Sequence, residues 1–482
     1  MLFNSIEFLI FLPIVFLLYW FMFKRLKVQN LFLLIASYVF YGYWNWKFLI
    51  LIVLTSLLSY ICGLLIASNE KHSKRQKTIS IVNILLNIGI LGVFKYYNFF
   101  ADNLAQLLSL VGIQTDFVTL NLILPVGISF YTFQALGYSI DVYNKKVPAC
   151  KDIVAFFAYI SFFPQLVAGP IERATNLLPQ FHKPRRFDYA QSVDGCRQIL
   201  WGFFKKMVVA DNCAIVVNSI WADYANQSGV TLLLAGVLFT FQIYGDFSGY
   251  SDIAIGTARL FGFNLMRNFN FPYFSRNIAE FWRRWHISLT TWFRDYIYIP
   301  LGGSKCAKWK VIRNTFIIFL VSGFWHGANW TFIVWGAYHA LLFVPLMLLK
   351  RNRKYTDIVA TGRLLPNIKE IGQMVLTFFL VVIGWIIFRS ENITQAGDYL
   401  VKMCCISFVD IGDIMQARLP LAAVFVLLLV EWIQREKQHA SQISSQTGIF
   451  KYRFARLVFY YLLIIITIVF AADQETFIYF QF

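Results

Sequence analysis

Long stretches without a charged residue recur along the whole of this 482-residue chain, among them residues 79–94, 330–349 and 421–430. A helix needs about 20 mostly apolar residues to cross the hydrocarbon core of a bilayer, and lipid admits only backbones whose hydrogen bonds are closed internally. Because 58% of the residues are hydrophobic and 14% are charged, a soluble fold could not bury this much apolar surface. We therefore expect an all-α polytopic membrane protein that forms one integral-membrane domain over residues 1–482.

The net charge of +18 comes from blocks of Lys and Arg between the apolar stretches. This pattern is typical of membrane proteins, whose cytoplasmic loops are enriched in Lys and Arg. It predicts about 12 crossings plus one re-entrant segment, with both chain ends outside. The first stretch, "FLIFLPIVFLLYWFMF", lacks a charged leader region and a cleavage site, so we expect a retained span rather than a signal peptide. A nucleic-acid site would need a concentrated basic face with aromatic platforms, so we expect no nucleic-acid partner.

The re-entrant segment is residues 153–169, which are apolar but have Lys151 before them and Arg173 after them. Basic residues on both sides place both ends of the segment in the cytoplasm. Pro164, Gly169 and Pro170 break a helix here, and irregular backbone at membrane depth is tolerated only inside protein or along a cavity. The segment therefore indicates an internal chamber.

The usual signatures of metal and cofactor sites are missing from this sequence. The seven cysteines have neither the spacing of a zinc site nor the pattern of a disulfide framework. The nucleophile elbow, the phosphate-binding loop, the H-E-x-x-H motif and the dinucleotide-binding glycine motif do not occur. We expect no metal ion and no bound cofactor.

His326 lies in "SGFWHGANW" (322–330), a short break between two apolar runs, 312–325 and 330–349. Two helices share fewer than forty residues here, so the break is expected to lie within the membrane. An ionisable residue at such depth is a functional candidate by default. A low dielectric favours the neutral imidazole, whose bare nitrogen can act as a general base. The alternative is a packing residue that holds Trp325 or a backbone carbonyl in place.

His286 lies in "NIAEFWRRWHISLTTWFRDYIYIPLGGS" (277–304), where Asn277 and Glu280 resemble a capping box. Apolar residues then recur at helical spacing as far as Pro300, which predicts one amphipathic helix at the cytoplasmic interface. Three arginines fall on its other faces: Arg283, Arg284 and Arg294. They either anchor the helix to the membrane surface or hold an anionic ligand, because a guanidinium recognises phosphate well.

The other four histidines are not expected to take part in the chemistry. His339, in "WGAYHALL", is expected to pack between helices, and His72, His182 and His439 lie in polar loops and are expected to be solvated.

"YGDFSGYSDIAIG" (244–256) places Asp246 and Asp252 in an otherwise apolar span, with Ser248 and Ser251 nearby. The two carboxylates are six residues apart and do not share a face of one straight helix. Gly245 and Gly249 have the spacing that permits close helix packing. The polar residues are either structural contacts between helices or functional contacts with a substrate. From the residues alone, a transporter fits this chain as well as an enzyme does.

Several motifs in order along the chain resemble the membrane-bound O-acyltransferase superfamily, and most closely its bacterial branch of alginate O-acetylation membrane proteins. They are "LPVGISFYTFQALGYSIDVY" (124–143), "AGPIERATNLLPQF" (168–181), the segments around Asp246, His286 and His326, and the terminal "FIYFQF". The resemblance implies a helical shell around a tunnel through the membrane. It places the family's catalytic histidine at His326 and its second polar signature residue at His286.

The resemblance further implies O-acetylation. A cytoplasmic thioester, acetyl-CoA, would donate an acetyl group to a hydroxyl that enters from the periplasmic side of the inner membrane. The acceptor would be an exopolysaccharide or cell-wall polymer, reached directly or through a periplasmic acetyltransferase partner. The remaining candidates for substrate binding are Asp246, Ser248, Arg283, Arg284, Arg294, Trp325 and Asn329, with residues 305–313 as a further basic cluster for the donor phosphates. The alternatives are acyl transfer from a carrier protein, as in teichoic-acid D-alanylation, and a polysaccharide exporter.

Overall fold

The computed structural model describes residues 1–70, 73–113, 120, 122–167, 169–405, 411–442, 451–473 and 475–480. Over these residues the regular structure is helical and contains no β-strand, which confirms the all-α prediction. The chain packs as two compact units. The first comprises residues 1–188, 261–265 and 327–329, and the second comprises 189–260, 266–326 and 330–482. That the whole chain forms one domain stays a prediction.

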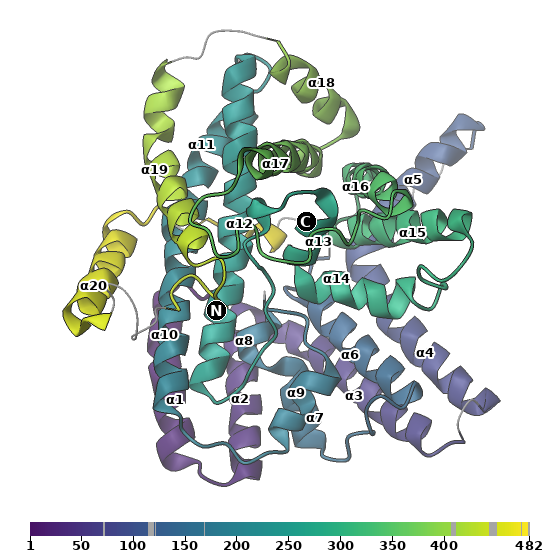
Figure 1. Cartoon of the computed structure of the whole chain (residues 1–482). Coiled ribbons are helices and arrows are strands. Elements are labelled where there is room, and N and C mark those ends of the chain that lie inside the picture. Colours follow the sequence, from purple (N-terminus) through teal and green to yellow (C-terminus); the bar gives the residue numbers. More distant parts are fainter. Residues whose placement is uncertain are drawn as a thin grey trace. The chain divides into compact units, whose positions relative to one another are not determined.

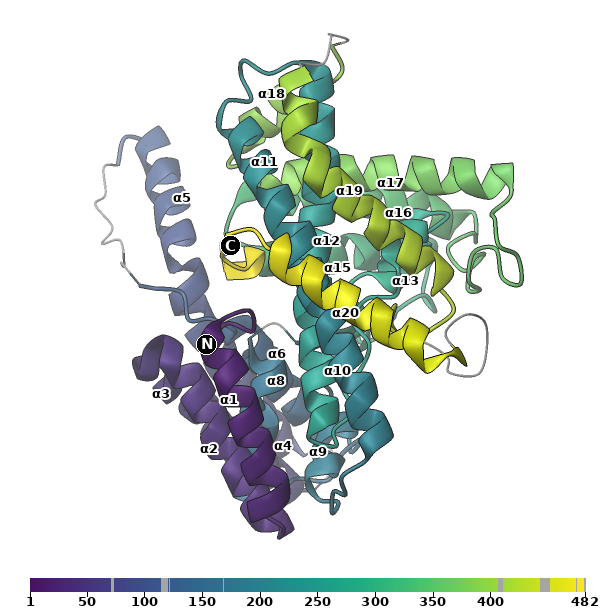
Figure 2. The same ribbon diagram turned by 90° about the vertical axis from the view of Figure 1, so that its left-hand side faces the viewer.

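The first unit consists of apolar helices (Figure 1, purple to blue). They are α1 (Ile6–Leu17), α2 (Leu26–Asn45), α3 (Leu49–Ala67), α4 (Lys74–Leu91), α5 (Tyr97–Leu110), α6 (Ile128–Tyr143), α7 (Ile153–Ser161), α8 (Phe163–Leu166) and α9 (Ala174–Phe181). Figure 2 shows α2 beside α3, and these two helices are in contact. Large apolar side chains such as Ile6, Leu85 and Leu107 are more than 60% exposed. Contiguous apolar surface of this kind is rare on soluble proteins and fits contact with lipid.

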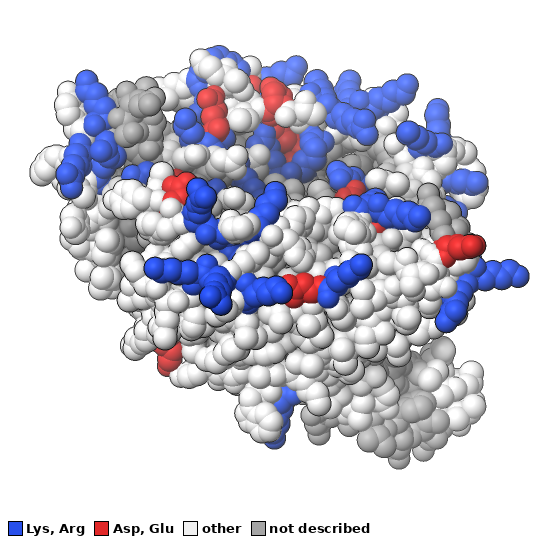
Figure 3. Space-filling model, turned by 90° about the horizontal axis from the view of Figure 1, so that it is seen from below, with Lys and Arg blue, Asp and Glu red and all other residues white. Residues whose placement is uncertain are grey.

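The described residues contain six helical stretches that are long and apolar enough to cross a membrane. They are Leu26–Ala67, Lys74–Leu110, Gly229–Leu260, Trp330–Leu348, Ile368–Arg389 and Ile414–Ile433. The first of them holds both α2 and α3. The protein is therefore multi-pass. Lys and Arg dominate the charged side chains on the face shown in Figure 3. The count of about 12 crossings and the side of each loop stay predictions.

The segment expected to be re-entrant is a broken helix, in which α7 and α8 are separated at Phe162. Pro164 lies in the first turn of α8, where its missing N–H group costs no hydrogen bond. The backbone groups freed by the break are bound by side chains. The Phe163 N–H donates to Ser37 Oγ (3.1 Å), and the Tyr159 carbonyl accepts from the Gln134 amide (2.7 Å). Irregular backbone is tolerated at membrane depth only where it is buried in protein or lines a cavity, and here protein side chains form its hydrogen bonds. That the segment enters and leaves on one side stays a prediction.

One expected loop is helical. The positive-inside pattern predicts a span over 79–100 and an external loop over 101–120, which contain no Lys or Arg, but α5 continues to Leu110. Leu107 and Leu108 follow Leu104 by three and four positions, so the apolar face of the helix continues past the single charge of Asp102. Residues 114–119 of this loop lie outside the described part of the chain.

The second unit is arranged around the long helix α12 (Gly229–Leu260) (Figure 1). Its other helices are α10 (Tyr189–Phe203), α11 (Asp211–Ala222), α13 (Ile278–Arg284), α14 (Ile287–Phe293), α15 (Lys308–His326), α16 (Trp330–Leu348), α17 (Ile368–Arg389), α18 (Ile393–Met403), α19 (Ile411–Ile433) and α20 (Arg453–Val469). A π-helical segment, Phe204–Ala210, joins α10 to α11. Helices α10, α11, α17 and α18 all pack against α12, most of which is buried.

Glycines allow α10 and α12 to approach backbone to backbone. A Cβ atom at Gly249 would lie 2.8 Å from the Gly202 carbonyl oxygen, and one at Gly202 would lie 2.7 Å from the Gly249 carbonyl oxygen. A Cβ at Gly245 would likewise lie 2.9 Å from the Lys205 carbonyl oxygen. The close packing predicted from Gly245 and Gly249 is therefore confirmed.

We expect Gly249→Ala to lower the apparent melting temperature of the protein in detergent. The added methyl group meets backbone atoms that cannot rotate away, and overpacking of this kind costs about 1–3 kcal/mol. Gly89→Ala in α4 is the matched control, because nothing lies within 4 Å of its Cβ position. The control should be neutral or slightly stabilising, since alanine favours a helix interior more than glycine does. Equal melting temperatures for the two variants would contradict the close packing.

Candidate active site

His326 is the last residue of α15, and α16 begins four residues later at Trp330. The two helices, of 19 residues each, form the expected helix–break–helix. They pack closely because a Cβ at Gly323 would overlap the Phe332 carbonyl oxygen and one at Gly336 would overlap that of Phe319. The predicted helix pair around His326 is therefore confirmed, and both helices fix the position of the imidazole. That the break lies within the membrane stays a prediction.

The His326 side chain is buried in a group of aromatic rings. The ring of Trp325 lies 4.9 Å away between centroids, that of Trp335 5.2 Å, that of Phe388 5.3 Å and that of Tyr479 5.4 Å. These rings come from α15, α16, α17 and the terminal segment. They keep water from the imidazole, so electrostatic interactions are stronger here than in solution.

His286 lies at a break between two short helices, and the expected single helix over 277–300 is wrong. α13 ends at Arg284, α14 begins at Ile287, and His286 adopts the left-handed conformation with φ of 43° and ψ of 55°. For a residue with a side chain this conformation costs about 1–2 kcal/mol. Local periodicity did not reveal it, because the apolar spacing continues in register across the break. The predicted capping box is only partly present. The Asn277 side chain accepts from the Glu280 N–H as expected, but the Glu280 carboxylate accepts from the N–H of Arg276.

The break turns the His286 imidazole into the protein interior, where 1% of the residue is exposed. Its Nδ1 lies 3.0 Å from Asn268 Oδ1, and its ring meets the edge of Phe247 at 4.6 Å between centroids. Burial lowers the pKa of the imidazole to about 3, so the ring is neutral at physiological pH.

The structure brings the two candidate histidines to the same pair of aromatic rings. Trp325 lies 4.9 Å from His326 and 6.1 Å from His286 between ring centroids. Tyr479 lies 5.4 Å from His326 and 6.3 Å from His286. Trp325, a candidate for substrate binding, is thus part of the surroundings of both imidazoles.

Tyr479 was missed as a site residue by the sequence analysis. Its hydroxyl is buried and has no hydrogen-bond partner among the described residues. The only signal in the sequence was the aromatic motif "FIYFQF". The whole motif supported the resemblance to the family, and Tyr479 was not singled out within it. Nothing local to residues 475–480 indicates that this segment lies against residues 150 positions earlier.

Asp246 holds the terminal segment in place. Its Oδ2 accepts from the Ile478 N–H at 2.7 Å, and its Oδ1 pairs with Lys206 Nζ at 2.9 Å. Lys206 also donates to Asp211 Oδ1 at 2.7 Å, and all three charged side chains are buried. Of the two interpretations of Asp246, these contacts support the structural one. A contact with substrate stays a prediction.

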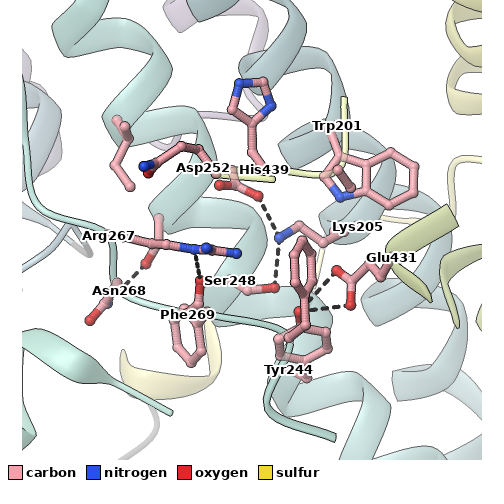
Figure 4. A pocket seen from close by; sticks show the side chains of 15 residues that line it. Trp201, Lys205, Tyr244, Ser248, Asp252, Arg267, Asn268, Phe269, Glu431 and His439 are labelled. Carbon is pink, nitrogen blue, oxygen red and sulfur yellow. Dashed lines mark hydrogen bonds and ion pairs between the residues drawn. The ribbon is translucent and has the colours of Figure 1, made fainter. Parts of the chain in front are cut away.

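Ser248 lines a small polar pocket (Figure 4). Lys205 Nζ donates to Ser248 Oγ (2.9 Å) and pairs with Asp252 (2.6 Å), while the Tyr244 hydroxyl donates to Glu431. The neighbouring lysines 205 and 206 therefore pair with different carboxylates of α12, as expected for two aspartates on different faces. Arg267 and Asn268 line the same pocket.

The three candidate arginines make intramolecular contacts. Arg283 donates to the Asn352 and Tyr355 carbonyls, and Arg294 pairs with the adjacent Asp295. Arg284 was expected on a displayed face, but it is buried and bonds Glu280 and the Asp357 carbonyl. That expectation is wrong because the loop after α16 covers this side of α13. Binding of an anion by these arginines stays a prediction.

The remaining candidates are placed as follows. Asn329 lies half-buried in the turn before α16. His339 is buried in α16 with Trp282 and Trp335 each 5.0 Å away, which supports a packing role. His182 is exposed, as expected, and His72 lies outside the described residues.

His439 was expected to be solvated, but that expectation is wrong. The residue is 2% exposed, its Nε2 lies 3.1 Å from Asp194 and its Nδ1 lies 2.9 Å from Ser441 Oγ. The polar sequence around it concealed a partner on α10, more than 240 positions away.

None of the seven cysteines forms a disulfide. In the part of the chain that the structure describes, no three His, Cys, Asp or Glu side chains are grouped closely enough to hold a metal ion.

Comparison with known proteins identifies relatives of this sequence. The model of the MBOAT, membrane-bound O-acyltransferase family matches residues 38–386. The "Probable alginate O-acetylase AlgI" of Pseudomonas aeruginosa is 40% identical over 431 residues, which cover 89% of this chain and 80% of that protein. The peptidoglycan O-acetyltransferase of Helicobacter pylori is 32% identical over 100% of this chain and 98% of its own length. The teichoic acid D-alanyltransferase of Bacillus subtilis is 30% identical over 56% of this chain and 70% of its own length.

Proposed function

Because this chain belongs to the membrane-bound O-acyltransferase family and is a membrane O-acyltransferase, we propose that it transfers acetyl groups from cytoplasmic acetyl-CoA to hydroxyl groups across the membrane. The observation that carries the proposal is the grouping of His326 and His286 around Trp325 and Tyr479, in surroundings that exclude water. A buried imidazole that meets both reactants is what acyl transfer to a hydroxyl requires.

In the proposed reaction His326 is the general base. It accepts the proton of the attacking hydroxyl, whose oxygen forms a bond to the carbonyl carbon of the thioester. The tetrahedral intermediate then collapses as the C–S bond breaks, and the proton passes from His326 to the leaving sulfur. The products are an ester and a free thiol. The thioester supplies its own activation, so the reaction consumes no nucleoside triphosphate.

His286 is the second polar group of the proposed site. It either positions the thioester or stabilises the charge that develops on the carbonyl oxygen. The basic residues Arg283, Arg294 and the 305–313 cluster would attract the phosphates of the donor. Charge of this kind raises the rate at which an anionic substrate finds its site.

The proposed acceptor is a hydroxyl of an exopolysaccharide or cell-wall polymer on the periplasmic side of the inner membrane. It is reached directly or through a separate periplasmic acetyltransferase. Two relatives are named for O-acetylation of alginate and of peptidoglycan, and they cover 89% and 100% of this chain. This coverage favours acetyl transfer over the second candidate, transfer of D-alanine from a carrier protein, for which the relative covers 56%.

The test is transfer of labelled acetyl groups by the purified protein in lipid, with acetyl-CoA inside the vesicles. The proteins encoded next to it and candidate polysaccharides are supplied outside. Label on a polysaccharide or on a partner protein is the expected result, and the labelled species identifies the acceptor. A parallel reaction uses a D-alanyl carrier protein as donor. Transfer from the carrier alone would replace acetyl-CoA in the proposal, and transfer from neither donor would overturn it.

A further inference from the structure

Asn268 lies between the pocket of Figure 4 and the imidazole of His286. It belongs to the irregular segment that follows α12, and its side chain is wholly buried. The Asn268 carbonyl accepts from the Ile287 N–H at 2.8 Å, which ties this segment to the break that carries His286. Its amide Nδ2 donates to Ser251 Oγ of α12 at 3.1 Å. Asn268 is therefore held through both its backbone and its side chain.

The orientation of this carboxamide follows from its neighbours. The Ser288 N–H points at Asn268 Oδ1 from 3.4 Å, and the Ser288 hydroxyl lies 2.9 Å from the same atom. A backbone N–H is always a donor, so the atom that faces it must be the amide oxygen. The reversed orientation would put an NH₂ group against this N–H and leave Ser251 without its donor.

The orientation of Asn268 decides which nitrogen of His286 carries the proton. Nδ1 lies 3.0 Å from the Asn268 oxygen, and a bare Nδ1 would set two lone pairs against each other. Nδ1 therefore donates, and in a neutral ring Nε2 is then an acceptor. Nε2 is buried and has no hydrogen-bond partner among the described residues. The low pKa that burial gives the imidazole is consistent with the neutral form.

We propose that Asn268 is a positioning residue for acyl transfer, which holds His286 with Nδ1 protonated and presents its bare Nε2 to the reactants as a hydrogen-bond acceptor. This inference rests on the proposed function and separates the two roles left open for His286. A neutral imidazole in this tautomer cannot donate from Nε2 to the oxygen of the thioester carbonyl. His286 instead accepts from an N–H or O–H group of a bound reactant, and the developing oxyanion is stabilised by other donors.

Nitrogen NMR of the protein in lipid, with labelled histidine, tests the tautomer without any substrate. The signals of His286 are identified by their loss in His286→Gln. We expect one protonated and one bare nitrogen in the wild type, with the proton on Nδ1. Asn268→Leu should shift the population toward Nε2 protonation, and Asn268→Asp should keep the proton on Nδ1 because a carboxylate oxygen still accepts it. Asn314→Leu is the control, since Asn314 is equally buried but bonds the Leu301 and Gly303 carbonyls.

Kinetics then test whether the tautomer matters for turnover. Loss of the partner that orients a metal-bound imidazole typically costs about 10–100-fold in activity. By analogy we expect Asn268→Leu to lower kcat by about this factor, with a smaller change in KM. Asn268→Asp should recover most of the loss. A purely structural role predicts no such rescue, because the charged carboxylate is the worse occupant of a buried packing position.

The outcomes distinguish this inference from the proposed function. An active wild type with the proton on Nε2, or an Asn268→Leu variant with unchanged tautomer and kcat, would overturn the inference alone. If Asn268→Leu does not fold, the wild-type spectrum and the Asn268→Asp variant still decide. Absence of acetyl transfer from any donor would overturn the proposed function, and the spectrum would still report whether Asn268 sets the tautomer.

Discussion

Replacing His326 by glutamine is expected to lower the rate of acetyl transfer by about 10²–10⁴-fold, the usual contribution of a general base. Glutamine has a similar size and retains hydrogen-bonding atoms, but it cannot take up a proton at neutral pH. The loss should appear in kcat, because the proton moves only in the transition state. The measurement is turnover of labelled acetyl-CoA by protein in lipid, with the amount of folded protein matched by size-exclusion chromatography.

The matched control is His339→Gln. His339 is a second buried histidine of the same helix pair, and it contacts Trp335, which also packs against His326. Because we assign His339 to packing, its variant should be less stable but turn over at a rate close to that of the wild type. Equal transfer by wild type and His326→Gln would remove His326 from the chemistry and leave it a structural role.

Replacing Lys206 by methionine is expected to destabilise the protein strongly. Lys206 Nζ contacts Asp211 Oδ1 at 2.7 Å, Asp246 Oδ1 at 2.9 Å and the Glu475 carbonyl at 3.1 Å. Without the ammonium group two carboxylates stay buried with no cation between them. Breaking a buried pair in this way costs about 3–5 kcal/mol, because it leaves uncompensated charge away from water. The apparent melting temperature in detergent, compared with that of the wild type, measures the effect.

The same change should weaken the site. Asp246 accepts from the Ile478 N–H, so the lysine indirectly holds the segment that carries Tyr479 against His326. Adding Asp211→Asn and Asp246→Asn to Lys206→Met removes the unpaired charges and should recover part of the stability. Lys151→Met, at an exposed lysine, is the control and should leave the melting temperature unchanged. A Lys206→Met protein as stable as this control would show that the three charges do not depend on one another.

Much of the second unit could be predicted from local sequence. The apolar runs and the Gly-rich break around His326 predicted a helix pair that the structure confirms within a few residues. The spacing of Gly245 and Gly249 predicted a close helix contact for the same reason: periodicity along one helix reports which side faces a neighbour. The break at His286 was not predicted, because its apolar residues stay in register while one left-handed residue turns the chain.

The sequence by itself, through its resemblance to the acyltransferase family, marked His326 and His286 as candidate catalytic residues. From its local pattern it also determined that this is a helical membrane protein with a break around His326. These features depend on contiguous residues, since hydrophobic runs and helix breakers act within a few turns of the chain. Only the tertiary structure decided that Tyr479 meets both histidines, that Asn268 orients His286, and that Lys206 joins Asp246 to Asp211. Such contacts join residues far apart in the chain. They are set by how the helices pack in space, which the period of a single helix does not encode.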